Sequence, residues 1–217
     1  MIPFGVARDA ELLVAWREGN HRAGEELFSR YFEPISRFFT NKVGSDHDDM
    51  IQETFEACVR GRDRLRDDTS FRAYLFSVAF NVLKGHFRRK RAHARIDDLG
   101  SISVHDISPG PSTLVGAVEQ EQLVLDALRR IPMDFQVVLE MRYWEEMSSV
   151  EIGAALGIPA PTVRSRLSRG REALERAIAQ LPARSQIRDS TVSELGAWIS
   201  RIRASMSLAS GSSSAEP

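Results

Sequence analysis

Arginine and hydroxyl side chains gather on one side of the stretch PTVRSRLSRGREALERA, residues 161–177. With about 100° between successive helical residues, one face of this stretch is small or apolar. That face is formed by Val163, Leu167, Gly170 and Leu174. The opposite side, with Arg164 at its edge, carries Thr162, Ser165, Arg166, Arg169 and Arg176. Arginine can donate two parallel hydrogen bonds to a guanine edge or a phosphate, so the pattern favours a DNA-reading helix. A solvated surface helix with scattered arginines is the alternative.

The residues before this stretch indicate the first helix of a helix-turn-helix. Ser148 and Glu151 have the S-x-x-E spacing of a capping box, which predicts a helix start. Gly157 predicts the end of that helix. Pro161 suits the first position of the next helix, where a missing N–H removes no hydrogen bond, and Ala160 would be a weak N-cap. A capped helix, a tight turn and an arginine-bearing second helix together favour DNA binding.

The segment RAYLFSVAFNVLKGHFRRKR, residues 72–91, is apolar over most of its circumference. Projected as a helix, it leaves one narrow polar strip, formed by Ser77, Asn81, Lys84, Arg88 and Arg91. Arg89 adds to the charge at its basic end. The strip predicts a helix packed in a bundle with one edge against nucleic acid. The alternative is a core helix whose basic end reaches solvent.

An acidic segment, DHDDMIQETFEACV at residues 46–59, precedes that helix. One face of the predicted helix carries Asp46, Asp49, Gln52, Glu53 and Glu56. The face that we expect to be buried carries Met50, Ile51, Phe55 and Val59. Because an acidic surface repels DNA, it indicates a second macromolecular partner with a basic surface, unless it is simply solvated.

His47 and Asp48 form the one dipeptide with a catalytic appearance. A metal-dependent phosphohydrolase would need further histidines at ligand spacing, and the five histidines of the chain are scattered. We therefore expect no catalytic residue, no metal site, no cofactor and no enzymatic activity.

Composition restricts the class of protein. The chain has 217 residues, 42% of them hydrophobic and 27% charged, which is typical of a globular protein with one large or two small domains. A net charge of −1 means that nucleic-acid binding depends on local patches. The single cysteine, Cys58, excludes an intramolecular disulfide. The sequence shows neither a signal peptide nor a span of about 20 apolar residues, so we expect a cytoplasmic protein without membrane insertion.

Helical spacing dominates the chain, and the alternating pattern of strands is rare, which predicts an all-α fold. We expect a helical domain over residues 9–95, a flexible linker over 96–118 and a second helical domain over 119–181. A C-terminal extension, residues 182–217, follows, with an amphipathic helix at 191–206 and a disordered end. Thr191 and Glu194 predict the start of that helix, which either completes the second domain or binds a regulator.

In this order, these segments resemble the extracytoplasmic-function (ECF) group of bacterial RNA polymerase sigma factors. The resemblance covers residues 9–95 and 119–181. DDMIQETF is similar to the D-L-V-Q-E-x-F core-binding motif of the family. Residues 71–91 are similar to a part of its region 2, and residues 128–174 are similar to its region 4. The resemblance implies a protein that binds core RNA polymerase and directs promoter recognition and transcription initiation.

The resemblance also implies roles for single residues. Core polymerase, through the clamp helices of its β′ subunit, would be bound by Asp49, Gln52, Glu53 and Phe55. The −10 element, with a flipped-out base near Leu65 and Asn81, would be bound by Leu65, Ser77, Asn81, Lys84, Arg88, Arg89 and Arg91. The −35 element would be bound by Thr162, Arg164, Ser165, Arg166 and Arg169.

The implied partners are core polymerase, through its β′ clamp helices and β flap, and promoter DNA. An anti-sigma factor is a further candidate partner, and we expect the free chain to be monomeric. The main alternative is a helix-turn-helix regulator that binds operators without polymerase. That alternative leaves the acidic segment and the polar strip around Asn81 without a role.

Overall fold

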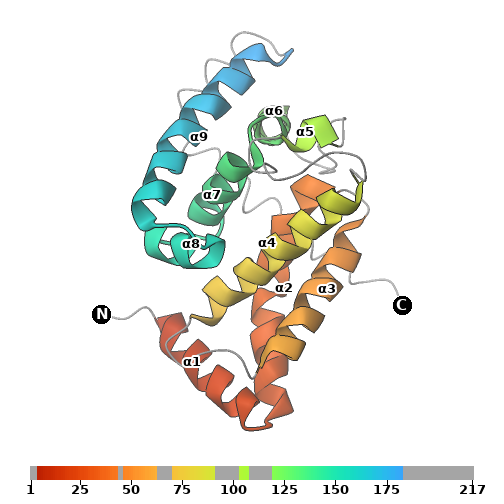
Figure 1. Ribbon diagram of the computed structural model, residues 1–217, viewed down its shortest axis with the longest axis vertical. Coiled ribbons are helices and arrows are strands. Elements are labelled where there is room, and N and C mark those ends of the chain that lie inside the picture. Colours follow the sequence, from red (N-terminus) through yellow and green to blue (C-terminus); the bar gives the residue numbers. More distant parts are fainter. Residues whose placement is uncertain (1–3, 44–45, 63–69, 91–102, 108–118, 183–217) are drawn as a thin grey trace.

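The computed structural model describes residues 4–43, 46–62, 70–90, 103–107 and 119–182 (Figure 1). These residues form helices and no strand, which confirms the predicted all-α fold. The amphipathic helix expected at 191–206 lies outside the described residues.

The first half of the chain is a bundle of four helices: α1 (Phe4–Arg17), α2 (His21–Val43), α3 (His47–Gly61) and α4 (Phe71–Lys90). Aromatic side chains fill the space between them. The Trp16 ring meets Phe28 edge-on at 5.1 Å, and Phe38 of α2 meets Phe76 of α4 edge-on at 5.8 Å. Aromatic rings bury large apolar areas, so the first contact holds α1 against α2 and the second holds α2 against α4.

A single helical turn, α5 (Val104–Ile107), lies in the segment 96–118, which we expected to be a flexible linker. The side chain of Val104 is fully buried, and Ser103 pairs with Pro132 in an isolated bridge. The Asp106 carboxylate accepts hydrogen bonds from the backbone N–H and the hydroxyl of Ser103, at 3.3 and 2.7 Å. The sequence pattern did not predict this turn, because two apolar residues in a four-residue turn are too few to show a period.

The second half contains α6 (Glu119–Arg130), α7 (Met133–Tyr143), α8 (Ser149–Leu156) and α9 (Ala160–Gln180). The predicted capping box is confirmed: Glu151 N donates to Ser148 Oγ at 3.2 Å, and Ser148 N donates to the Glu151 carboxylate at 2.8 Å. Gly157 ends α8 in the left-handed region, with φ of 68°, a conformation that glycine adopts without strain.

The start of α9 differs by one residue from the prediction. Pro159, in an extended conformation, is the N-cap, so Ala160 is the first helical residue and Pro161 the second. Both positions of the first turn lack an intrahelical partner for their N–H, so Pro161 removes no hydrogen bond in either register.

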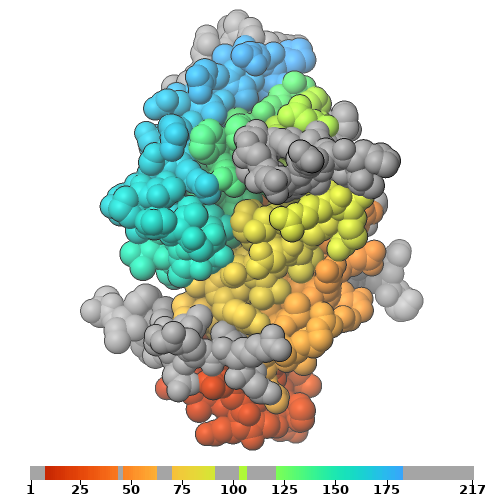
Figure 2. Space-filling model, in the orientation of Figure 1, coloured from red at the N-terminus to blue at the C-terminus, as the bar shows by residue number. Residues whose placement is uncertain are grey.

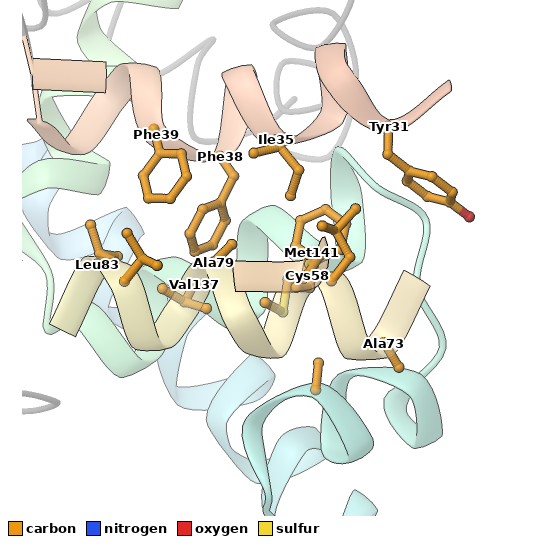
Figure 3. Close-up of a cluster of buried hydrophobic side chains, with 14 of the residues drawn as sticks. Tyr31, Ile35, Phe38, Phe39, Cys58, Ala73, Ala79, Leu83, Val137 and Met141 are labelled. Atoms are coloured by element: carbon orange, nitrogen blue, oxygen red, sulfur yellow. The ribbon is translucent and has the colours of Figure 1, made fainter. Parts of the chain in front are cut away.

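The two halves pack together around one shared apolar core (Figure 3). Its buried side chains come from α2, α4 and α7 and include Ile35, Phe38, Ala79, Leu83, Val137 and Met141. Helix α8 lies across α4, where Arg72 pairs with Glu151 at 3.9 Å. Figure 2 shows α8 and α9 beside α4 on one face of the molecule.

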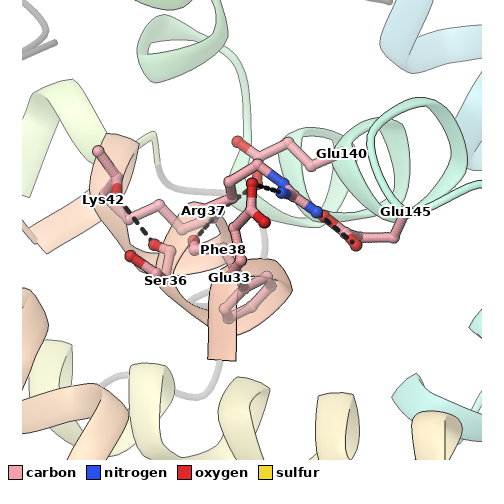
Figure 4. A network of polar contacts seen from close by, with 8 residues as sticks. Glu33, Ser36, Arg37, Phe38, Lys42, Glu140 and Glu145 are labelled. Carbon is pink, nitrogen blue, oxygen red and sulfur yellow. Dashed lines mark hydrogen bonds and ion pairs between the residues drawn. The ribbon is translucent and has the colours of Figure 1, made fainter. Parts of the chain in front are cut away.

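Polar contacts also join the halves (Figure 4). The buried Arg37 of α2 donates through Nε and Nη2 to the buried carboxylate of Glu145, at 3.2 and 3.3 Å. Lys42 pairs with Glu140 of α7. Asn41 Nδ2 donates to the carbonyl of Leu125 at 3.3 Å. The arrangement of the halves is therefore specified by hydrogen-bonded charges as well as by apolar packing.

Candidate functional site

The exposed side of α9 carries the residues expected to bind the −35 element. Arg164, Ser165 and Arg169 are exposed, and Thr162 and Arg166 are half-buried. The opposite face is buried at Val163, Gly170 and Leu174 and half-buried at Leu167, as the spacing predicts. Helix α9 therefore has an apolar back fixed to the protein and a polar, cationic front.

Two side chains of α7 that the sequence did not single out contact this front. Arg166 Nη2 lies 2.5 Å from Asp134 Oδ2, and the Arg169 guanidinium lies 6.0 Å from the centre of the Phe135 ring. Arg169 Nη2 also donates to the Ser165 hydroxyl at 2.9 Å. The predicted −35 residues are thus brought together and partly held in place before DNA is bound.

Helix α4 presents the predicted polar strip at its exposed edge. Asn81, Arg88 and Arg89 are exposed, whereas Ser77 and Lys84 are half-buried. Leu65 and Arg91, the remaining residues expected to bind the −10 element, lie outside the described residues. Phe76 and Phe87 are fully buried on the other side. The strip is therefore an edge of a packed helix, as the sequence predicts.

Lys84 lies in a partly apolar environment. Its Nζ is 4.6 Å from the centre of the Phe80 ring. Burial lowers the pKa of Lys84 below its usual value, Arg88 lowers it further, and the carboxylate of Asp134 opposes both effects. The charge of Asp134 on α7 thus acts on a cation of α4 as well as on one of α9.

Helix α3 carries the residues expected to bind core polymerase. Asp49 and Gln52 are exposed, and Glu53 and Phe55 are half-buried. Gln52 Nε2 donates to Glu56 at 2.8 Å. This hydrogen bond, with a contribution from Arg60, lowers the pKa of Glu56. Glu53 also pairs with Arg89 of α4 at 3.4 Å, so a predicted polymerase contact touches a predicted −10 contact.

The apolar face of α3 corrects the sequence prediction. The buried residues are Met50, Ile51, Thr54 and Cys58, whereas Val59 is 50% exposed. Thr54 can be buried because its hydroxyl donates to the carbonyl of Met50 at 2.7 Å. The buried face of α3 is therefore centred on Thr54 and Cys58, and Val59 lies beside it, exposed to solvent.

Because α3 is rotated in this way about its axis, an apolar groove forms between α2 and α3. Its volume is about 640 Å³, and it is lined by Phe32, Asp48, Ile51, Gln52, Phe55, Glu56, Val59 and Arg60. The Phe32 and Phe55 rings stack at 6.4 Å with 8° between their planes, and Phe32 is 49% exposed. An exposed apolar groove with an acidic edge is typical of a protein-binding surface rather than of a DNA-binding one.

The described residues contain no group of three or more His, Cys, Asp or Glu side chains that could hold a metal ion. His47 Nε2 lies 3.2 Å from Asp48 Oδ1, and this pair faces solvent. In the part of the chain that the structure describes, no helix is both long and apolar enough to cross a membrane.

Two family models match the chain and together cover more than half of it. "Sigma-70 region 2" matches residues 27–93, and "Sigma-70, region 4" matches residues 121–174. The first match contains α3 and α4, and the second contains α7, α8 and the polar front of α9.

Whole-length comparisons agree with these matches. The ECF RNA polymerase sigma-E factors of Escherichia coli K12 and Salmonella typhimurium are 27% identical over 182 residues, which is 80% of this chain and 95% of theirs. Among solved structures, CnrH in complex with the cytosolic domain of CnrY has a TM-score of 0.58 at 24% identity, covering 79% of this chain and 97% of that one. The sigma factor RpoE of Bartonella quintana, in complex with the anti-sigma factor NepR, has a TM-score of 0.57 at 18% identity, covering 72% of this chain and 96% of that one.

The structural matches show the fold, and the sequence matches show the family. The chain therefore belongs to the sigma-70 family of RNA polymerase sigma factors, in the extracytoplasmic-function group, whose members bind core RNA polymerase and direct promoter recognition.

Proposed function

We propose that three surfaces of this sigma factor divide the work of promoter recognition. The groove between α2 and α3, with Asp49, Gln52, Glu53 and Phe55, binds the β′ clamp helices of core polymerase. The strip on α4 (Ser77, Asn81, Lys84, Arg88, Arg89), with Leu65 and Arg91, binds the −10 element. The front of α9 (Thr162, Arg164, Ser165, Arg166, Arg169) binds the −35 element.

One observation carries this proposal: the exposed apolar groove with an acidic edge coexists in one chain with the cationic front of α9. An operator-binding regulator needs only the second surface. A subunit that brings polymerase to promoters needs both, because its affinity for DNA is added to its affinity for a protein partner. The chain then acts in the cytoplasm by binding polymerase and positioning it on promoter DNA, and residues 9–95 and 119–181 form the two domains that do so.

An anti-sigma factor is a further partner that we propose. In the two solved structures named above, the similar chain is bound to a second protein: CnrH to the cytosolic domain of CnrY, and the sigma factor RpoE to the anti-sigma factor NepR. A protein of that kind would have to cover the groove or the DNA-binding surfaces in order to compete with polymerase or promoter.

The decisive experiment compares two matched substitutions, Val59→Asp and Val14→Asp. Val59 is 50% exposed in the groove, and Val14 is 49% exposed on α1, so both variants place the same charge at the same degree of exposure. A charge in an apolar interface should weaken the affinity for core polymerase by about tenfold or more in Val59→Asp. Val14→Asp should bind like the native chain.

The measurements are the affinity for fluorescently labelled core polymerase and run-off transcription from genomic DNA. We expect discrete new start sites that appear only when the chain is added. Transcription from these sites should be weaker with Val59→Asp and unchanged with Val14→Asp. Equal binding by both variants would exclude the groove as the polymerase contact. Tight binding of duplex DNA by the chain alone, with no new starts, would instead favour the operator-binding regulator.

A further inference from the structure

Asp134 lies in the first turn of α7, and its carboxylate contacts Arg166 on the front of α9. Both side chains are about one quarter exposed, so this pair is partly shielded from water. An ion pair in this environment holds the arginine more firmly than a fully exposed pair does.

Close packing between α7 and α9 fixes this contact. A Cβ atom on Gly170 would lie 3.2 Å from Phe135 Cβ and 3.4 Å from side-chain atoms of Leu139. Gly170 therefore lets α9 approach α7 more closely than a residue with a side chain would. This close approach brings Asp134 and Phe135 of α7 against Arg166 and Arg169 of α9.

The front of α9 thus contains two kinds of arginine. Arg166 and Arg169 are held against side chains of α7, whereas Arg164 is exposed at the other edge. A held arginine loses little rotamer freedom when it binds, and its fork already has a fixed direction. Reading a base edge needs a fixed direction, whereas attracting a phosphate needs only a positive charge.

We propose that Asp134 is a positioning residue that sets the sequence preference of this sigma factor at the −35 element by holding Arg166. This inference rests on the proposed role of α9. The carboxylate orients the arginine toward one base pair and at the same time offsets its charge. Asp134 therefore increases discrimination between −35 sequences and decreases general attraction to the DNA backbone.

The test uses holoenzyme, assembled from core polymerase and the full chain, on a promoter library with every base of the −35 element varied. In Asp134→Asn, the preference for the best base at the pair that Arg166 reads should fall by about fivefold. Because the released arginine can neutralise a further phosphate, the logarithmic salt dependence of promoter binding should steepen by up to about 1. Glu172→Gln, which removes a charge from the exposed Glu172 of α9, should leave the base preference unchanged.

A double substitution separates positioning from a general structural effect. If Asp134 acts through Arg166, then Asp134→Asn should change the preference by less than about twofold in an Arg166→Ala background. Asp134→Glu keeps the charge and moves it by one methylene. It should therefore also alter the preference, which keeps the test decisive if Asp134→Asn melts early.

Three outcomes overturn the inference. An unchanged base profile in both Asp134→Asn and Asp134→Glu shows that Asp134 sets no preference. An equal change with and without Arg166 shows that it acts by another route. A native holoenzyme that starts transcription with no −35 preference removes the proposed role of α9, and this inference falls with it; the first two outcomes leave that role intact.

Discussion

The side chains of Lys42 on α2 and Glu140 on α7 form an ion pair between residues 98 positions apart in the chain, and both are buried (Figure 4). Lys42 also donates to the carbonyl of Phe38, and Glu140 accepts from Gln136 Nε2 at 2.8 Å. Burial lowers the pKa of Lys42 and raises the pKa of Glu140, and each partner opposes the shift of the other. The pair thus joins the two halves, and losing one of its charges alone would leave the other buried without a partner.

The first prediction concerns this joint. Lys42→Met should lower the free energy of unfolding by about 3–5 kcal/mol, because it leaves the Glu140 carboxylate buried without its cation. The double variant Lys42→Met/Glu140→Met should recover to within about 1 kcal/mol of the native chain, since apolar side chains of similar volume can replace a buried pair. Urea unfolding, followed by circular dichroism, measures both values. A double variant as unstable as Lys42→Met would show that the pair does not act as one.

The joint also shows what the sequence could and could not predict. Local patterns predicted the helix-turn-helix, because the capping box of Ser148 and Glu151 and the turn at Gly157 depend only on neighbouring residues. The exposed edge of α4 around Asn81 followed from helical spacing for the same reason.

Contacts between distant residues had no such signal. Nothing in the sequence around Lys42 or Glu140 indicates that they meet, and Asp134 became a candidate only when α7 was placed against α9. The burial of Thr54 in place of Val59 was missed because a threonine reads as polar until its hydroxyl is seen to bond the backbone. The groove that results is the part of the candidate site that the sequence described least well.

The second prediction compares two glycines. At Gly153, a Cβ atom would lie 2.6 Å from the carbonyl oxygen of Ile158, which is backbone and cannot turn away. Gly153→Ala should therefore distort the turn between α8 and α9 and cost about 1–3 kcal/mol of stability. At Gly85, inside α4, the nearest atom is the mobile guanidinium of Arg89 at 3.5 Å. Gly85→Ala should stabilise the chain by about 0.5–1 kcal/mol, because alanine restricts the unfolded chain more.

Thermal melting of the two glycine variants and of the native chain tests both predicted changes in stability. The melting temperature should fall in Gly153→Ala and rise in Gly85→Ala. A Gly153→Ala variant that melts at or above the native temperature would show that the turn can accommodate a side chain.

The third prediction concerns Cys58, the single cysteine of the chain. Its side chain is fully buried in α3, and burial raises the pKa of its thiol from 9.0 to about 12. The thiolate is the reactive form, so at pH 8 its fraction is lowered roughly 1000-fold compared with an ordinary thiol. Iodoacetamide should label the native chain at least ~100-fold more slowly than the chain in 6 M guanidinium. Labelling at similar rates would mean that α3 separates readily from the bundle.

The last prediction concerns pH. His86 of α4 is buried, and its Nε2 has no hydrogen-bond partner among the described residues. Burial lowers the pKa of His86 below 6.5; Lys90 and Arg89 lower it further, while Asp46 and Glu53 oppose them. As the pH falls below about 6.5, the unfolded chain takes up a proton that the folded chain resists. Stability should therefore fall between pH 7.5 and the lowered pKa, and this part of the loss should be absent in His86→Leu.

The variant Lys90→Met provides a second test of the role of His86, because it should change the acid response in a known direction. Lys90 lies 3.5 Å from Asp46, and its charge disfavours protonation of His86. Without it, the pKa of His86 should move back toward its ordinary value, so the loss of stability on acidification should be smaller than in the native chain. Urea unfolding of the three proteins at pH 7.5 and 5.5 gives the comparison. If His86→Leu loses as much stability as the native chain, another group dominates the acid response, and burial of His86 does not govern it.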